Sequence, residues 1–511
     1  MNPIVLDHVA HHARVWPHRT ALTELVTGRT WTWQQFDQDA RRAEAVLRQR
    51  IGTTAGARVA MLSRNSAAML IVQQACIRSG AIFVPLNWRL AAPEIRFLLE
   101  DCQPALLVHE EMFAPLVPAE ASCPRLVIGE THDELATAMA GCEAVGVGRG
   151  QALDPQTPIT ILYSSGTTGK PKGAVVSLLN AFTGAFGLAL ATQVSASSRL
   201  LLDMPLFHTA GLFGATWSQL VMGGSVLISQ RFDAPVTYER LASTVLGVTH
   251  YFSVTQMAMM MRQLPDFDGR KLSRLTAYVT GGSPNPAAHH RSWLDEGVMM
   301  LNGFGMSETC SSTATPMGDL EWLKRKAGTV GVTHLSVEFR IVRADGQDAA
   351  TNEVGELWAR GATVMSGYWN RDELNRQAFK DGWFRTGDAA LCDEDGFYML
   401  VDRIKDMFIS GGENVYPAEI EAALSAMPGV ADMAVIGVPD ERWGEVGCAY
   451  VVPGPHAALT AQQVMDHCAQ LLARYKVPKH VVITTTIERT ASGKAQKHLL
   501  LERWRRESGA T

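Results

Sequence analysis

The chain has 511 residues, too many for one hydrophobic core of ordinary size, so two or more domains are expected. Hydrophobic residues make up 47% and charged residues 19% of the chain, proportions of a globular protein that exclude a disordered or fibrous one. The formal net charge of -5 leaves no overall positive field, so no nucleic-acid partner is expected.

The eight cysteines are scattered, without a C-x-x-C pair or a neighbouring histidine cluster. Such spacing predicts reduced structural thiols and neither a zinc site nor a disulfide framework. The first residues carry Asp7, His8 and Arg14 and lack the apolar segment of a secretory signal. No stretch predicts a membrane span. A cytoplasmic location is therefore expected.

Short runs rich in Val, Ile and Leu alternate with helix-like stretches through most of residues 1–400. The runs fall at 58–62, 81–86, 105–109, 125–128, 159–163, 200–204, 225–229, 248–254, 275–280 and 299–301. This alternation predicts an α/β fold in which crossover helices join parallel strands. Ligands bind such sheets at the carboxyl ends of the strands. Unusual residues follow four of the predicted strands, in the loops after Tyr163, Met204, Thr280 and Leu301.

Between residues 340 and 397 the pattern changes to short strand-like pieces separated by Asp-Gly turns, which predicts a β-rich subdomain. A smaller α+β unit follows. Its helices are expected at 417–426 and 461–474 and its strands at 434–438 and 449–452. We therefore predict a large N-terminal α/β domain, residues 1–402, and a small C-terminal domain, residues 403–511.

Residues 163–173 read Tyr-Ser-Ser-Gly-Thr-Thr-Gly-Lys-Pro-Lys-Gly and follow a predicted strand. Glycines let backbone N–H groups converge on an anion, hydroxyl groups add hydrogen bonds, and Lys172 adds positive charge. The segment predicts a phosphate-binding loop; a flexible Gly/Ser linker is the alternative. Its glycines lie too close together for G-x-x-x-x-G-K-[ST], which disfavours P-loop NTPase chemistry. The predicted contacts are Ser164, Ser165, Gly166, Thr167, Thr168, Gly169 and Lys172.

This segment closely resembles the signature of the adenylate-forming enzymes, which include acyl-CoA synthetases, peptide-synthetase adenylation domains and firefly luciferase. The resemblance extends from about Arg29 to Lys497, with the motifs in the family's order, and is closest to acyl-CoA synthetases. It implies stacked sheets in the large domain and a mobile small domain. It also implies an ATP-dependent acyl-CoA ligase that uses Mg²⁺ and coenzyme A and forms an acyl-AMP intermediate.

His208, in the stretch 205–211, lies in the segment that resembles the acyl-site segment of the family. The resemblance places it between the acyl pocket and the tunnel for the pantetheine arm of CoA. Amino-acid-activating relatives usually have Asp there. Because histidine supplies no fixed negative charge for an ammonium group, an α-amino acid substrate is disfavoured. A core-packing histidine is the alternative.

Residues 280–284 and 302–309 resemble the two segments on the adenine side. The resemblance implies that Phe304 stacks on adenine and that Glu308 binds magnesium through a hard oxygen. A solvated glutamate is the alternative for Glu308. The family commonly has Tyr in place of Phe304 and Thr in place of Ser307. The other nucleotide-binding residues implied here are Gly281, Gly282, Ser283, Asn302, Gly303, Gly305 and Ser307.

Residues 382–388 resemble the ribose segment, in which Asp388 accepts hydrogen bonds from the ribose hydroxyls. Arg403 is implied as a cationic contact to the ribose or to phosphate. Residues 402–406 match the hinge, with Lys405 at the pivot position. Solvated surface charges are the alternative for each of these residues.

Residues 410–417 resemble the loop that enters the site for the thioester step, with Gly411 and Gly412 beside the pantetheine arm and Trp443 at its border. A Trp that only packs is the alternative. Three basic residues are candidates for the CoA phosphates, with surface solvation an equal alternative: Arg89, Lys476 and Lys479.

Residues 489–494 match the catalytic-lysine segment. Lys494 is implied to neutralise the substrate carboxylate and the α-phosphate as these two anions approach each other, which is electrostatic stabilisation of the reacting charges. After adenylation, rotation about Lys405 would remove Lys494 and bring in the loop that contains Gly411.

The acyl pocket is expected to draw on residues 207–214 and 251–261 and on the backbone near Gly281 and Gly305. A methionine-rich stretch suits an adaptable apolar wall, so the acid is expected to be a fatty acid or another apolar carboxylic acid; plain core packing is the alternative. Two other functions stay open. One is transfer of the acyl group to a carrier-protein thiol, and the other is a half-enzyme that only binds or uses acyl-AMP. A homodimer is also left open.

Overall fold

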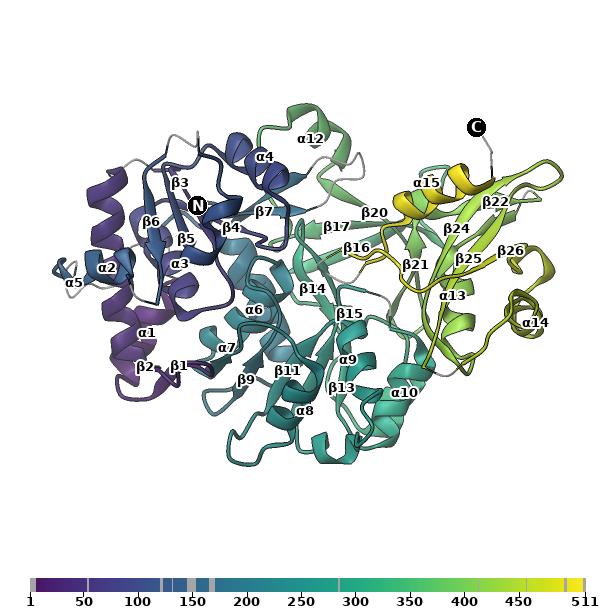
Figure 1. The fold of residues 1–511 in the computed structure, drawn as a ribbon, viewed down its shortest axis with the longest axis horizontal. Helices are drawn as coiled ribbons and strands as arrows, with labels where there is room; N and C mark the ends of the chain where they lie inside the picture. Colours follow the sequence, from purple (N-terminus) through teal and green to yellow (C-terminus); the bar gives the residue numbers. More distant parts are fainter. Residues whose placement is uncertain are drawn as a thin grey trace.

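The computed structural model describes residues 6–52, 55–119, 123–130, 132–144, 153–164, 171–283, 285–411, 413–455, 457–490 and 494–508. The chain forms a large unit of stacked sheets and a small C-terminal unit. Figure 1 shows the large unit in purple to green and the small unit in yellow-green to yellow at one end of the molecule. The predicted fold class is confirmed.

Two large sheets form the layers of the first unit. The order of the nine-stranded sheet is β15 (Val332–Thr333), β14 (Cys310–Ala314), β13 (Met300–Met306), β12 (Ala277–Thr280), β11 (His250–Ser253), β9 (Arg199–Leu202), β10 (Ser225–Ile228), β1 (Thr20–Glu24) and β2 (Thr30–Thr32). The order of the seven-stranded sheet is β18 (Gly367–Tyr368), β8 (Lys172–Ser177), β7 (Pro158–Ser164), β4 (Ile82–Leu86), β3 (Arg58–Leu62), β5 (Leu106–Glu110) and β6 (Arg125–Ile128).

The ten predicted apolar runs all overlap strands of these two sheets: β3, β4, β5, β6, β7, β9, β10, β11, β12 and β13. Pairings such as β3 with β4 and β11 with β12 are parallel, as expected. Two pairings that border the predicted site are antiparallel, β7 with β8 and β13 with β14. The phosphate loop therefore connects two strands of a hairpin.

Helices cover and separate the sheets. Helix α3 is buried at nearly every position, including its polar residues Gln73, Gln74 and Arg78, because it contributes to the core that both sheets share. The helices of the large unit are α1 (His8–Val15), α2 (Trp33–Ile51), α3 (Ala67–Ser79), α4 (Ala92–Cys102), η1 (Glu111–Leu116), α5 (Glu134–Ala140), α6 (Leu178–Ala191), η2 (Ala210–Trp217), α7 (Ser218–Val221), α8 (Ala234–Ala242), α9 (Thr255–Arg262), η3 (Gly269–Leu272), α10 (Ala287–Asp295), α11 (Leu320–Arg325) and α12 (Asp372–Ala378).

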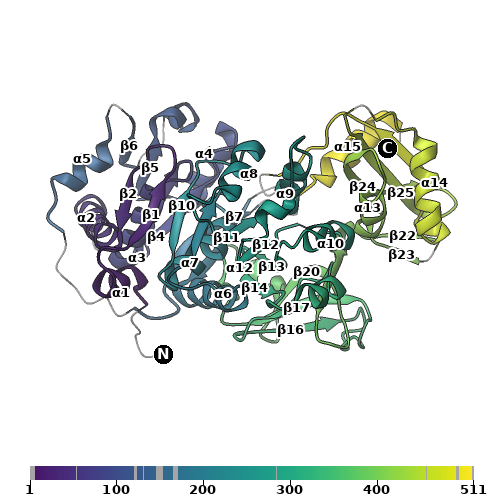
Figure 2. The ribbon, with the colours of Figure 1, turned by 90° about the horizontal axis from the view of Figure 1, so that it is seen from below.

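The β-rich subdomain is a third, antiparallel sheet. Its strands are β16 (Val337–Val342), β17 (Gly355–Gly361), β20 (Trp383–Cys392), β19 (Phe379–Lys380) and β21 (Tyr398–Arg403). Figure 2 shows this sheet below the small unit. Strand β21 pairs with β20 as far as Arg403, and the first strand of the small unit begins at Phe408. The domain boundary after residue 402 stays a prediction.

The small unit has its own sheet and its own buried core, which includes Phe408, Leu424 and Val435. Its strands are β23 (Glu413–Val415), β22 (Phe408–Ser410), β25 (Gly444–Pro453), β24 (Val430–Asp440) and β26 (His480–Ile483). Its helices are η4 (Ile404–Asp406), α13 (Pro417–Ser425), α14 (Ala461–Leu471), η5 (Arg474–Lys476) and α15 (Lys497–Ser508). Within the described ranges, no helix is long and apolar enough to cross a membrane.

Candidate active site

The predicted phosphate loop connects β7 to β8. Ser164 ends β7, Lys172 begins β8, and the two residues lie opposite each other in the ladder. The Ser164 hydroxyl oxygen is buried and has no hydrogen-bond partner among the described residues, so it is available to a ligand. The loop residues between them, Ser165, Gly166, Thr167, Thr168 and Gly169, lie outside the described residues.

Lys172 and Glu308 lie side by side although they belong to different sheets. Their Nζ and Oε1 atoms are 3.5 Å apart. Tyr368 of β18 lies between them: its hydroxyl is 2.6 Å from Lys172 Nζ and donates to Glu308 Oε1 at 2.8 Å. Burial and the Glu308 charge raise the pKa of this tyrosine, so the hydroxyl keeps its proton. This arrangement joins the predicted phosphate lysine to the predicted magnesium carboxylate.

The surroundings of Glu308 fit a magnesium ion held by one carboxylate. Oε1 accepts one hydrogen bond, from Tyr368, whereas no hydrogen bond to Oε2 is formed by a described residue. The described part of the chain has no cluster of three His, Cys, Asp or Glu side chains that could hold a metal ion. Since magnesium prefers hard oxygens and retains several waters, Glu308 and phosphate oxygens would complete the site.

Close backbone packing shapes the hairpin β13–β14 on the predicted adenine side. A Cβ atom at Gly305 would lie 2.0 Å from the Cys310 carbonyl oxygen, and one at Gly303 would lie 2.9 Å from the Thr313 carbonyl oxygen. Phe304 is half-buried and meets Phe339 edge to face at 6.1 Å between ring centroids. The glycines allow this approach, which carries the chain around Phe304 to Glu308.

Asn302 has a different environment from the one expected of a nucleotide contact. Its amide group donates to Thr329 O and pairs with the His290 ring, and its oxygen accepts from Thr280 and Asn285. These hydrogen bonds tie the ends of β12 and β13 together. The other residues predicted on the adenine side lie in the turns that follow β12 and β13. Gly281 and Gly282 follow β12, and the Ser283 carbonyl group accepts a hydrogen bond from Thr255. Ser307 lies in the turn before Glu308.

Asp388 and Arg403 form an ion pair on paired positions of β20 and β21. The Arg403 Nε atom lies 2.7 Å from Asp388 Oδ1. The second oxygen, Asp388 Oδ2, is buried and lacks a hydrogen-bond partner among the described residues. Burial raises the pKa of this carboxyl group, and Arg403 and Lys494 oppose that effect. A buried acceptor without a partner fits a ligand that brings hydroxyl donors, as ribose does.

Lys494 of the small unit belongs to the same charge cluster. It interacts electrostatically with Asp388 and Glu308, which raise its pKa, and with Arg403, which lowers it. The residue is exposed, yet desolvation by the surrounding protein is the largest effect and leaves the Lys494 pKa below its ordinary value. The two units therefore meet with this ammonium group at the predicted nucleotide site.

His208 lies two residues before η2, and its ring centroid is 4.6 Å from that of Phe207. Burial, followed by the charges of Arg89 and Lys494, lowers the pKa of His208 to about 4, so the ring is neutral near pH 7. Its Nε2 atom is buried without a hydrogen-bond partner in the described structure. A neutral ring with one free nitrogen can accept or donate a hydrogen bond to a ligand.

The residues predicted for the thioester step and the hinge belong to the small unit, where Lys405 interacts electrostatically with Lys494. Gly411 has a φ of +63° and packs against Trp443, whose ring a Cβ at position 411 would approach to 2.5 Å. Gly412 lies outside the described residues. Lys405 is half-exposed in η4, 3.8 Å from Asp406. Each candidate for binding the CoA phosphates has a contact within the protein. Lys476 pairs with Glu419, Lys479 pairs with Asp440, and Arg89 packs over Trp88.

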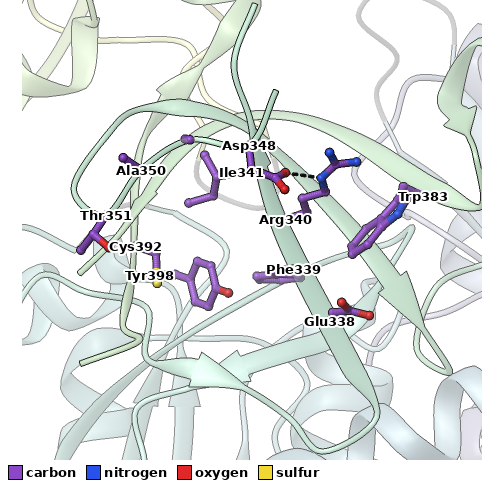
Figure 3. Close-up of a pocket in the computed structure, with 11 residues that line it drawn as sticks. Glu338, Phe339, Arg340, Ile341, Asp348, Ala350, Thr351, Trp383, Cys392 and Tyr398 are labelled. Carbon is purple, nitrogen blue, oxygen red and sulfur yellow. Dashed lines mark hydrogen bonds and ion pairs between the residues drawn. The ribbon is translucent and has the colours of Figure 1, made fainter. Parts of the chain in front are cut away.

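A cavity of about 490 Å³ opens in the β-rich sheet (Figure 3). Phe339, Tyr398 and Cys392 form its apolar side, and Arg340 pairs with Asp348 at its edge. It contains none of the residues predicted to act on a nucleotide or an acid. The charge cluster, which contains such residues, is therefore the candidate active site.

Tyr368 is the member of the cluster that sequence reasoning missed. Its partners Lys172 and Glu308 lie 196 and 60 positions away along the chain. The local sequence Ser-Gly-Tyr-Trp has no periodicity or charge pattern that marks a polar contact. Tyr368 lies between β17 and β20 of the β-rich sheet, and no local signal marks it as a partner of either charge.

Both units match known families and proteins. Residues 9–369 match the AMP-binding enzyme model, and residues 419–494 match the AMP-binding enzyme C-terminal domain. The indoleacetate–CoA ligase of Aromatoleum aromaticum is 39% identical over 86% of this chain and 86% of its own length. A feruloyl-CoA synthase of an Amycolatopsis species is 36% identical over 95% of this chain and 96% of its own length.

The three-dimensional structure is also similar to solved structures. The ATP-bound crystal structure of MatB from Rhodopseudomonas palustris matches with a TM-score of 0.88 and 29% identity, over 99% of each chain. The apo structure of the same protein matches with a TM-score of 0.79 over the same share of each chain. The chain therefore belongs to the AMP-binding enzyme family, with both the N-terminal and the C-terminal domain.

Proposed function

We propose that the chain is an AMP-forming acid–thiol ligase that activates an apolar carboxylic acid as acyl-AMP and transfers the acyl group to coenzyme A. The observation that carries this function is the single charge cluster to which both units contribute. In it, Lys494 interacts with Asp388 and Glu308, and Lys172 lies beside Glu308. Relatives over most of the chain are named as CoA ligases or synthases.

The first half-reaction joins the acid to AMP. A carboxylate oxygen attacks the α-phosphorus of ATP, the bond to the β-phosphate breaks, and pyrophosphate leaves. The Lys494 ammonium offsets the repulsion between carboxylate and α-phosphate, and Lys172 binds the departing phosphates. Asp388 accepts hydrogen bonds from the ribose hydroxyls. Glu308 would hold a magnesium ion, which would supply positive charge against the polyphosphate.

The second half-reaction needs a different arrangement of the two units. The CoA thiol sulfur attacks the acyl carbonyl carbon and AMP leaves with the electron pair of the broken bond. We place the boundary after residue 402 and the pivot at Lys405, between β21 and β22. Rotation there would withdraw Lys494 and bring Gly411, Gly412 and Trp443 to the acyl group. His208 borders both the acyl and the thiol sides.

The side chains around the proposed acyl site support an apolar acid. Phe252 of β11 lies against Gly214 and Gly281, where a Cβ atom would approach its ring to 3.1 Å and 3.5 Å. Met257 and Met261 of α9 are buried near the end of the same strand. The relatives named for indoleacetate and ferulate suggest aromatic acids for the first trials, with fatty acids beside them.

An acid screen tests this function. Acids that are substrates should support acid-dependent exchange of labelled pyrophosphate into ATP and, with CoA, give a thioester detected by mass. Acylation of a holo carrier protein but not of CoA would transfer the second step to that acceptor. Absence of exchange with every acid, together with use of supplied acyl-AMP, would identify a half-enzyme.

A further inference from the structure

Tyr368 is held in place independently of the two charged residues that its hydroxyl contacts. Its strand β18 pairs with β8, so that Tyr368 lies opposite Ala174. The Asn375 side chain accepts from the Tyr368 backbone N–H at 2.7 Å and donates to its carbonyl oxygen at 3.0 Å. The residue is 5% exposed. The position of the ring is therefore fixed by the backbone and by packing.

The hydroxyl group bridges two opposite charges. An ammonium group only donates, so Lys172 donates to the tyrosine oxygen, and the tyrosine proton is left for Glu308 Oε1. The direct distance between Lys172 Nζ and Glu308 Oε1 is 3.5 Å, longer than an ordinary hydrogen bond. Lys172 also lies 4.1 Å from the centroid of the Tyr368 ring. The tyrosine thus holds the lysine through two kinds of contact.

Without the hydroxyl, the two charges would be drawn together. Glu308 is 4% exposed, and opposite charges attract more strongly where water is excluded. A direct ion pair would occupy the carboxylate and the ammonium group with each other. A ligand that needs both, such as a polyphosphate with its metal ion, would first have to break that pair.

We propose that Tyr368 is a positioning residue for Mg-ATP, an inference that rests on the proposed adenylation function. Its hydroxyl group occupies Glu308 Oε1, leaves Oε2 for the cation, and keeps Lys172 short of a direct ion pair with Glu308. Lys172 and Glu308 then remain available to the β- and γ-phosphates and their metal ion. AMP lacks those phosphates, so its binding does not depend on the bridge.

The experiment compares Tyr368→Phe with the wild-type chain by calorimetric titration of ATP and of AMP, with and without Mg²⁺ and with no acid present. The matched control is Tyr238→Phe on α8, because the buried Tyr238 hydroxyl also makes two hydrogen bonds, both to the Asp268 backbone. We expect Tyr368→Phe to weaken Mg-ATP binding about tenfold, as loss of hydrogen bonds to charged groups does, and to leave AMP binding unchanged. Tyr238→Phe should bind both like the wild type.

A second variant separates positioning from folding. In a Lys172→Gln background the tyrosine hydroxyl has no ammonium group to hold. Adding Tyr368→Phe to it should therefore weaken Mg-ATP binding less than tenfold. Equal weakening of AMP and Mg-ATP by Tyr368→Phe would mean a merely structural role and would overturn the inference. Unchanged Mg-ATP binding would also overturn it. Failure of the wild-type chain to bind ATP would instead overturn the proposed function, and this inference with it.

Discussion

For its proposed role, the Lys494 side chain must carry its proton and must lie close to anions. The fold brings it to Asp388 and Glu308, although it belongs to the small unit. Desolvation, the largest effect, lowers its pKa below the ordinary lysine value. An ammonium group at this place would offset the repulsion between the incoming carboxylate and the α-phosphate.

Lys494→Ala should suppress adenylation by about 100-fold or more, the scale on which removal of one electrostatic donor acts. Use of supplied acyl-AMP with CoA should change little, since the proposed rotation withdraws this residue before the thioester step. Pyrophosphate exchange and thioester formation from acyl-AMP measure the two steps. Lys324→Ala, which removes a lysine that pairs with Asp295 on the surface, is the control. Equal loss of both steps would contradict the assigned role.

The lowered Lys494 pKa also gives a pH dependence. The ammonium form is the active one, so adenylation should decline as pH rises through that pKa, at a pH below the ordinary lysine value of 10.5. His208, with a pKa of about 4, stays neutral across the neutral range and should add no ionisation near pH 6.5. Pyrophosphate exchange as a function of pH measures both expectations. A profile that stays flat to pH 10.5 would disagree with them.

At the scale of the elements, the hairpin β13–β14 allows its backbone few conformations. It turns Phe304 and Glu308 toward the site while its strands remain in close contact at Gly303 and Gly305. Cys310, at the start of β14, has a φ of +51°, a left-handed conformation that few residues other than glycine adopt. The geometry of this hairpin therefore depends on Gly303 and Gly305 as well as on the charged Glu308.

Gly305→Ala should damage the site through the backbone. The new Cβ would lie 2.0 Å from the Cys310 carbonyl oxygen, so the hairpin must shift at a cost of about 1–3 kcal/mol. We expect a lower melting temperature and adenylation reduced at least tenfold. Gly141→Ala is the matched control, because a Cβ there meets neighbours only at ordinary contact distance. Unchanged adenylation in Gly305→Ala would show that the hairpin tolerates the shift.

For the whole molecule, the arrangement of the two units decides which chemistry is available. With Lys494 at the charge cluster, the chain matches ATP-bound MatB with a higher TM-score than apo MatB. Lys405, the proposed pivot, lies in the short segment η4, between β21 of the large unit and β22 of the small unit. We therefore interpret this arrangement as the one for adenylation, from which the thioester step requires rotation.

Lys405→Pro should hinder that rotation. Proline fixes φ near −65°, a value that suits the 3-10 turn of η4 but excludes most others. Adenylation should be retained, whereas thioester formation from acyl-AMP should fall at least tenfold. Lys405→Ala removes the side chain and keeps φ free, so it should affect thioester formation far less. A Lys405→Pro variant that forms thioester at the wild-type rate would place the pivot elsewhere.

Local pattern made most of the fold predictable. Apolar runs bounded by turn residues located the parallel strands, and Asp-Gly turns located the β-rich sheet, because both signals depend on neighbours in the chain. The pairing of β7 with β8 in an antiparallel hairpin was not evident, since strand direction depends on partners. Helix α15 was also missed. The motifs containing Asp388, Lys494 and Glu308 could each be identified in the sequence. Their sequences do not show how far apart these residues lie in space.

The sequence by itself determined the fold class, the order of the motifs and the family, because these follow from local residue patterns and their succession. Only the tertiary structure decided which charges meet. Lys172, Glu308 and Tyr368 come from three separated segments, and Lys494 from the other unit, yet their charges interact. Coulomb attraction and desolvation depend on distance and burial in space, which a position along the chain does not specify.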